Sequence, residues 1–278
     1  MINFGARGHD VTWADTPELL AQGLDGYGVH NVQLALPRQF PDLADRINPG
    51  MGMYFRRVLG ERGVDIAVLG CYINMTHPDP DSREAALRRF EAYLANARFF
   101  GAPVVASETG SVDAAPGRFT EENFTEAMYQ ESLASVRRLV DFGARFGTIV
   151  GVEPGANHPI YDIATTERLL ADVDSPYLGI VFDPTAYTAP DGRTVHDGDQ
   201  VEITHKALKA FGERIVAVHI DDFTVGEDGL HRCNVDEGVM DVRGVLEAVS
   251  AALPYVPVIL EETRDEAIAR TVRRYGAL

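Results

Sequence analysis

Cysteines and long apolar runs are both scarce in this sequence. Its 278 residues include two cysteines, Cys71 and Cys233, which are far apart and indicate no disulfide framework. No apolar stretch approaches the roughly 20 residues that a membrane-spanning helix needs. The first residues also lack the pattern of a signal peptide. We therefore expect a reduced, soluble, cytoplasmic protein with no membrane partner.

Basic residues are also in short supply. Lysine and arginine together number 25 against 42 aspartates and glutamates, which gives a net charge of −17. A surface this acidic repels phosphate backbones, and the sequence has no basic run that would form a local exception. We expect no nucleic acid partner and favour a small-molecule substrate, while a homo-oligomer stays open.

What the sequence does contain is an alternation of short apolar segments and longer amphipathic ones. The apolar segments are hydrophobic throughout, which is typical of parallel strands covered by helices. We predict strands at Ile2–Ala6, Val29–Ala35, Asp65–Gly70, Pro103–Ser107, Thr148–Glu153, Leu178–Phe182, Ile215–Ile220 and Val256–Leu260. We predict helices at Pro17–Leu24, Ser82–Phe100, Glu121–Phe146, Thr166–Val173, Ile203–Phe211, Val242–Leu253 and Arg264–Tyr275. A weaker helix is expected around Met53–Arg62, behind a loop that contains Pro37, Pro41, Pro49 and Gly50.

This alternation predicts an α/β protein, a (β/α)₈ TIM barrel that forms one domain over residues 1–278. The rival is a doubly wound open sheet that binds a nucleotide. Such a sheet usually has a glycine-rich turn after its first strand, and Gly5-Ala6-Arg7-Gly8 does not complete that fingerprint. The barrel is therefore the favoured architecture.

Catalytic groups of such barrels lie where the strands end at their carboxyl side. There the first four strands provide Arg7, His9, Asp10, Gln33, Cys71, Tyr72, Asn74, Glu108 and Thr109. The next four strands end in Glu153, Asp183, His219 and Glu261, each from a different strand. Taken singly, each of these four has an ordinary explanation, such as a cap, a turn or a histidine satisfied in the core. Their occurrence at four successive strand ends favours a shared site.

Buried carboxylates that lie together require a compensating cation. A set of three carboxylates and one imidazole suits one divalent metal, with Mn²⁺ or Mg²⁺ first and Co²⁺, Fe²⁺ or Zn²⁺ as alternatives. The choice of Glu261 over Glu262 depends on which residues of the last strand point inward, so an error of one residue stays open. We predict one metal ion bound by Glu153, Asp183, His219 and Glu261.

The same segments resemble the xylose isomerase-like barrels, specifically the sugar phosphate isomerase/epimerase branch, over nearly the whole chain. The motifs that carry this resemblance are Val152-Glu153-Pro154, Phe182-Asp183-Pro184, Val216-Ala217-Val218-His219-Ile220 and Ile259-Leu260-Glu261-Glu262-Thr263. The segment Leu69-Gly70-Cys71-Tyr72-Ile73-Asn74 and the turn Glu108-Thr109-Gly110 are also similar. The resemblance implies that Glu153 and Glu261 are catalytic as well as metal ligands. They would move a proton on opposite faces of the carbon beside a carbonyl, through a metal-stabilised enediolate.

The sequence departs from this family at three positions. Ala186 replaces a common histidine, Val225 replaces a common arginine, and His219-Ile220-Asp221-Asp222 lacks a common lysine. In the family the first two residues help to hold the carbonyl end of the substrate, so their replacement argues against a standard ketose epimerisation and mildly favours a lyase. The missing lysine removes a positive charge near the rim and makes a phosphorylated substrate less suitable. We therefore predict a metal-dependent isomerase or epimerase of a non-phosphorylated sugar or polyol.

Several other rim residues are candidates for contacts with the substrate. They are Arg7, His9, Trp13, Glu108 and His158, while His231 and Arg232 lie on a loop after the seventh strand. A lyase or dehydratase acting on a keto-sugar, keto-glycoside or cyclitol is the alternative function. Two further alternatives are a DNA-repair endonuclease of the apurinic-site type, which the acidic charge disfavours, and a non-enzymatic binding module.

Overall fold

The strands of the protein form a closed parallel barrel. The computed structural model describes residues 1–115, 118–188, 199–227 and 229–278. In this part of the chain the barrel has the order β1-β10-β7-β6-β5-β4-β3-β2. Its strands are β1 (Asn3–Arg7), β2 (Asn31–Leu34), β3 (Asp65–Gly70), β4 (Val104–Glu108), β5 (Ile149–Glu153), β6 (Leu178–Phe182), β7 (Ile215–Ile220) and β10 (Pro257–Leu260). The predicted (β/α)₈ barrel is therefore confirmed, with all eight strands at the expected places.

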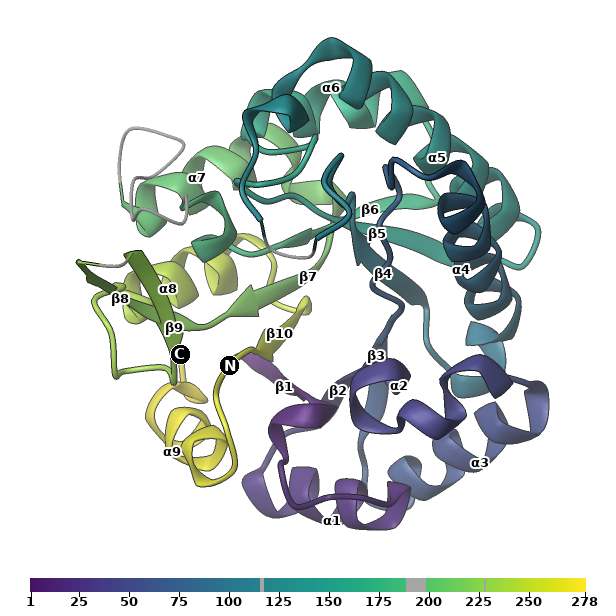
Figure 1. Cartoon of the computed structure of the whole chain (residues 1–278). Helices are drawn as coiled ribbons and strands as arrows, with labels where there is room; N and C mark the ends of the chain where they lie inside the picture. The colour runs from purple at the N-terminus through teal and green to yellow at the C-terminus, as the bar shows by residue number, and fades with distance from the viewer. Residues whose placement is uncertain (116–117, 189–198, 228) are drawn as a thin grey trace.

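The helices surround the barrel as an outer ring (Figure 1). They are α1 (Pro17–Tyr27), α2 (Leu36–Gln39), α3 (Pro49–Gly60), α4 (Pro80–Phe100), α5 (Glu126–Ala144), α6 (Ile163–Val173), α7 (Gln200–Phe211), α8 (Val242–Ala252) and α9 (Glu266–Tyr275). Short 3₁₀ turns lie at Gly8–Asp10, Pro41–Arg46, Glu121–Phe124, Thr185–Tyr187 and Gly212–Arg214. Within the described residues, no helix has the length and apolarity to cross a bilayer.

Two predicted helices differ from the structure for reasons of capping. Pro49 was expected in a loop, but it is the first residue of α3, because Asn48 accepts a hydrogen bond from the backbone of Met51 and proline is tolerated in a first turn. The predicted helix Glu121–Phe146 is divided at Thr125, whose backbone is extended and whose hydroxyl caps α5. The predicted cap Thr16 is confirmed on α1.

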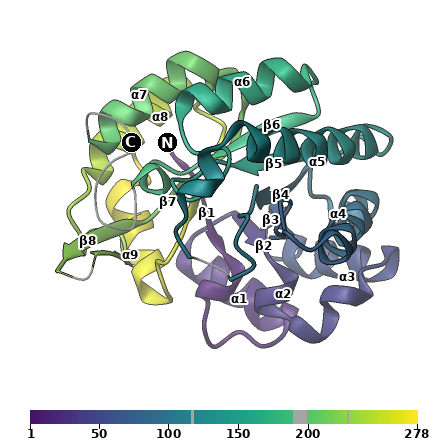
Figure 2. The same ribbon diagram turned by 45° about the horizontal axis from the view of Figure 1, so that its top comes forward.

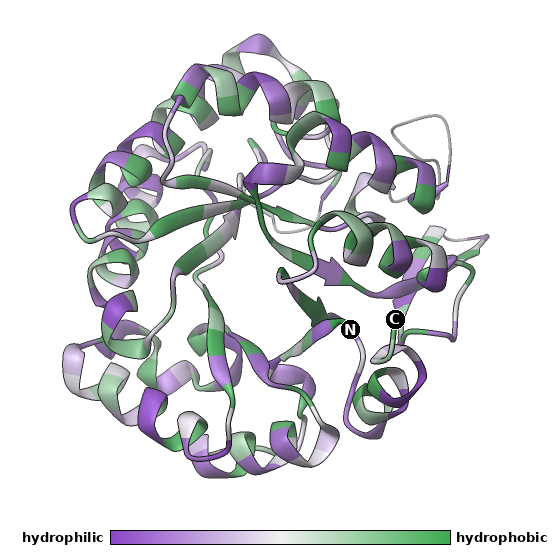
Figure 3. Ribbon diagram, turned by 180° about the vertical axis from the view of Figure 1, so that it is seen from behind, coloured by the Kyte–Doolittle hydropathy of each residue, from purple (hydrophilic) through white to green (hydrophobic). Residues whose placement is uncertain are grey.

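The core has two parts because side chains alternate across the barrel wall. Outward-facing residues such as Val105 pack against the helices. Alternate residues on the other face, among them Val104, Ala106, Ala217 and Ile259, form a separate cluster that fills the barrel interior. Figure 3 shows the corresponding pattern, with apolar strands inside a ring of mixed helices.

One element outside the barrel differs from the prediction, because the sequence indicates only a loop after the seventh strand. The strands β8 (Asp222–Gly226) and β9 (Gly229–Cys233) pair in antiparallel register as a hairpin, with Phe223 opposite Arg232. Figures 1 and 2 show the hairpin projecting at the edge of the molecule near α9. This hairpin brings Arg232 back to the barrel rim.

Candidate functional site

The candidate residues reach the rim by continuing the alternation of the barrel interior. Ala106, Ala217 and Ile259 fill the interior, and Glu108, His219 and Glu261 each stand two residues further along the same strand direction. Val181 relates to Asp183 in the same way. Because side chains alternate between the two faces of a strand, these ionisable groups point to the same space above the barrel interior.

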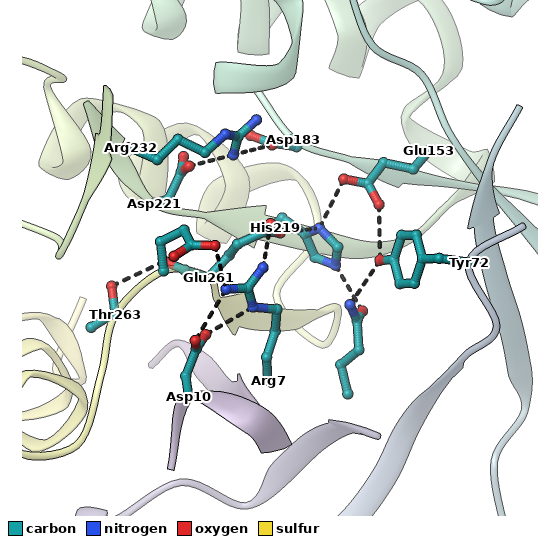
Figure 4. A network of polar contacts seen from close by, with 12 residues as sticks. Arg7, Asp10, Tyr72, Glu153, Asp183, His219, Asp221, Arg232, Glu261 and Thr263 are labelled. Atoms are coloured by element: carbon teal, nitrogen blue, oxygen red, sulfur yellow. Dashed lines mark hydrogen bonds and ion pairs between the residues drawn. The ribbon is translucent and has the colours of Figure 1, made fainter. Parts of the chain in front are cut away.

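Three of the four predicted metal ligands converge. Ligand atoms of Glu153, His219 and Glu261 all lie within 4.8 Å of one another. Nδ1 of His219 is 3.2 Å from Oε1 of Glu153 and 2.9 Å from Oε2 of Glu261 (Figure 4). His219 is fully buried and Glu153 is nearly so. Two carboxylate oxygens and one imidazole nitrogen at this spacing are a donor set that fits a divalent cation.

The electrostatics of this cluster also fit a cation. Burial raises the pKa of Glu153, although His219 partly opposes the shift. Burial alone would lower the pKa of His219, but the carboxylates of Glu153 and Glu261 raise it well above its ordinary value. The imidazole thus carries one positive charge between two carboxylates, and a bound divalent ion would supply two.

Glu261, rather than Glu262, faces the cluster. Glu262 has a backbone φ of 48°, in the left-handed region, and its carboxylate is directed to Arg7 and Arg264. Glu261 accepts a hydrogen bond of 2.7 Å from Nη1 of Arg7. Burial would raise the pKa of Glu261, but Arg7 and His219 hold it well below its usual range.

The fourth predicted ligand, Asp183, lies in a neighbouring ion cluster. One of its oxygens accepts from the backbone of Thr185 at 2.8 Å, and the other accepts from Nη1 of Arg232 at 2.9 Å. The same Arg232 nitrogen contacts Asp221. Asp183 and Asp221 are both buried, and one oxygen of Asp221 has no hydrogen-bond partner among the residues that the structure describes. Here a guanidinium group compensates the two carboxylates.

Arg232→Ala is expected to destabilise the metal-free protein by roughly 3 kcal/mol. This is the lower end of the range for breaking a buried ion pair, because 29% of the Arg232 side chain is exposed. Urea unfolding in the presence of a chelator measures the change. The matched control is Arg264→Ala, because Arg264 pairs with Glu262 but its side chain is 60% exposed. Its removal should lower the free energy of unfolding by less than about 1 kcal/mol. If Arg232→Ala loses no more stability than Arg264→Ala, this explanation is contradicted.

The predicted substrate contacts divide into two groups. Arg7, His9, Glu108 and His158 line the cavity above the cluster, which has two lobes of about 540 and 460 Å³ that share Glu108 and the glutamates of the cluster. Trp13 does not line this cavity. Its indole nitrogen donates to the hydroxyl of Tyr27, a residue of α1, at 3.0 Å.

The cavity histidines differ in their charge. Burial lowers the pKa of His9 to about 4, and the adjacent Arg7 acts in the same direction. Burial also opposes the charged form of His158, but Glu108, whose carboxylate lies 3.6 Å away, raises the pKa of this histidine. Near neutral pH the cavity thus has a neutral imidazole in one lobe and a more basic imidazole in the other.

Some residues of the site had no role in the sequence-based prediction. Gln33, Tyr72 and Asp10 were noted at the rim, but only the structure shows that Tyr72 donates to Glu153 and that Asp10 binds Arg7 through two hydrogen bonds. Arg232 was assigned to a loop. The glycines at 226 and 229, which flank the tip of the hairpin, were the available signal for its position.

Comparisons with known proteins agree with this architecture. A family model described as xylose isomerase-like TIM barrel matches residues 19–276. No curated protein sequence matches the chain. The 3-keto-D-glucoside 4-epimerase from E. coli is a similar solved structure, with a TM-score of 0.75 and 16% identity over 100% of this chain and 98% of that chain.

Two further structures are similar at the level of fold. The probable 3-DHS dehydratase AsbF from Bacillus anthracis has a TM-score of 0.73 and 13% identity, over 98% of this chain and 99% of its own. A xylose isomerase-like TIM barrel protein from Mycobacterium smegmatis, solved with magnesium, has a TM-score of 0.68 and 17% identity, over 95% of this chain and 89% of its own. Because the family model spans most of the sequence, this chain belongs to the xylose isomerase-like TIM barrel family.

Proposed function

We propose that this protein is a divalent-metal-dependent isomerase or epimerase that moves a proton beside a carbonyl group of a non-phosphorylated sugar or polyol. The observation that carries the proposal is the convergence of Glu153, His219 and Glu261 within 4.8 Å at the base of an open cavity. These three residues, with Asp183, would hold the metal. Mn²⁺ is the first candidate, and Mg²⁺, Co²⁺, Fe²⁺ or Zn²⁺ are the alternatives. When bound, the metal polarises the carbonyl and stabilises the negative charge that develops on its oxygen.

The protein's own residues supply the proton transfer. Glu153 and Glu261 are the acid–base pair, because each has a carboxylate at the cavity floor within reach of a bound ligand. His9, Glu108 and His158 would bind substrate hydroxyl groups from the cavity walls. Arg7 donates to Glu261, Glu262 and Asp10 through its three nitrogens, which favours a role in orienting Glu261.

The charges of the cavity support a substrate without phosphate. The larger lobe is lined by five carboxylates (Asp10, Glu108, Glu153, Glu261 and Glu262) and three guanidinium groups (Arg7, Arg38 and Arg264). Arg7 and Arg264 are already paired with carboxylates. With a divalent metal bound these charges would nearly balance, so a dianionic phosphate would find little net positive charge, whereas hydroxyl groups would find many acceptors.

A lyase or dehydratase on a keto-sugar, keto-glycoside or cyclitol is the second candidate. It is favoured by the unequal surroundings of the two glutamates, since Glu261 is paired with the permanently charged Arg7 whereas Glu153 accepts from the neutral Tyr72. A carboxylate paired with a guanidinium is the weaker proton acceptor. An elimination needs one strong base, whereas an epimerisation uses two.

Product analysis separates the two candidates and tests the metal. The Mn²⁺-loaded protein is incubated in D₂O with ketoses, inosose-type cyclitols and keto-glycosides, and the products are followed by NMR. The first candidate predicts deuterium at the carbon beside the carbonyl in an isomeric product. A dehydrated or cleaved product would instead establish the second. Turnover that persists unchanged after the metal is removed with a chelator would contradict both.

A further inference from the structure

The ligand atom of His219 is held in place by a closed ring of hydrogen bonds. Nε2 of His219 is 2.8 Å from Oε1 of Gln33, and Nε2 of Gln33 donates to the hydroxyl of Tyr72 at 2.9 Å. That hydroxyl donates to Oε2 of Glu153 at 3.0 Å, and Oε1 of Glu153 lies 3.2 Å from Nδ1 of His219. The ring joins side chains from or just after strands β2, β3, β5 and β7, and Figure 4 shows Tyr72, Glu153 and His219 facing one another.

Only one arrangement of donors and acceptors fits this ring. The Tyr72 hydroxyl donates its single proton to Oε2 of Glu153. The phenol oxygen then accepts from Gln33, which requires the amide nitrogen of Gln33 to face Tyr72. The amide oxygen therefore faces His219, and because that oxygen can only accept, Nε2 of His219 carries a proton.

The backbone of β2 supports this placement of Gln33. The register between β2 and β3 shifts between Val32 and Gln33, as in a β-bulge. Bulges beside active sites change the direction of a side chain. Gln33 is 1% exposed although it is polar, and both ends of its amide are hydrogen-bonded within the ring. The strand therefore departs from regular pairing at the residue that contacts His219.

We propose that Gln33, oriented by Tyr72, is a positioning residue that keeps a proton on Nε2 of His219 and so directs Nδ1 to the metal. The inference depends on the proposed function, because it concerns how the chain presents a ligand atom to the metal. Nδ1 is the nitrogen that faces Glu153 and Glu261. Partners that bind the second nitrogen of a metal-bound histidine fix its tautomer and ring orientation, and their loss weakens metal affinity by about 10–100-fold.

Calorimetric titration of the metal-free full-length chain with Mn²⁺ tests this role. Gln33→Leu keeps a similar volume but removes the acceptor, so its Kd is expected to rise by about 10–100-fold. Gln33→Glu restores an acceptor for the Nε2 proton and is expected to bind with a Kd close to the wild-type value. Tyr72→Phe removes the group that orients the amide and is expected to have a smaller effect than Gln33→Leu. Thermal unfolding of each metal-free variant confirms that it is folded.

Equal Kd values for Gln33→Leu and the wild type would overturn the role of Gln33 and leave the proposed function intact. Absence of Mn²⁺ binding by the wild type would overturn the proposed function, and with it the ligand role of Nδ1. A second measurement needs no variant at position 33. NMR of the Zn²⁺-loaded wild type labelled with ¹⁵N-histidine, assigned with His219→Gln, should place the proton on Nε2. A proton on Nδ1 would overturn the inference even if Gln33→Leu did not fold.

Discussion

His219→Ala is expected to abolish tight binding of Mn²⁺. His219 is the only one of the three converging ligands that contacts both of the others, because its Nδ1 lies between Glu153 and Glu261. Its loss removes a ligand atom directly, so the effect should exceed the roughly 10–100-fold that follows loss of an outer partner. Metal content after dialysis, measured by atomic emission, and Mn²⁺ titration both report the change.

The control for this variant is another cavity histidine. His158→Ala removes an imidazole from the cavity wall, where the ring contacts the carbonyl of Gly110 and the carboxylate of Glu108. Because His158 lies outside the converging triad, its variant should keep the Mn²⁺ affinity of the wild type. Normal metal content in His219→Ala would remove His219 from the site and refute the proposed ligand set.

Glu153→Gln and Glu261→Gln are each expected to reduce turnover by at least about 10²–10⁴-fold, the usual contribution of a positioned acid or base. The amide preserves the size of the side chain but cannot accept a proton. Metal content must be measured in parallel, because both residues are also proposed ligands. Solvent-proton exchange into the substrate, followed by NMR at saturating Mn²⁺, reports the chemical step itself.

Glu262→Gln is the matched control for this pair. Glu262 follows Glu261 directly, but it is directed away from the cluster to Arg7 and Arg264, so turnover should change little. Near-full activity in Glu153→Gln or Glu261→Gln would end the two-base proposal for that residue. If Glu261→Gln keeps proton exchange while Glu153→Gln loses it, the single-base lyase is favoured.

The barrel could be predicted because its signal is local in the sequence. Each strand is a short apolar run bounded by turn residues, and each ends in a residue that the period of two aims at the rim. For example, Ile259 is buried inside the barrel, so Glu261 follows it inward and Glu262 does not. The same reasoning predicts from the sequence that Glu153, His219 and Glu261 lie together, and the structure shows that they do.

Contacts that depend on a segment folding back toward the barrel could not be predicted in this way. Arg232 reaches Asp183 and Asp221 because β9 folds back on β8. The glycines at 226 and 229 indicate a turn, but they do not show which residues of the barrel rim Arg232 would contact. The role of Gln33 depends on a register shift within β2 and on a hydroxyl from the loop after β3. Trp13 shows the reverse case, since a residue near the first strand is held elsewhere by Tyr27.

A crystal structure of the Mn²⁺-loaded protein with anomalous diffraction data tests the central claim most directly. We expect one anomalous peak within about 2.0–2.3 Å of oxygen or nitrogen atoms of Glu153, His219 and Glu261, with Asp183 as the fourth ligand and Arg232 displaced from it. A peak elsewhere, or none in a crystal soaked at a saturating concentration, would contradict the proposed metal centre and leave only the barrel.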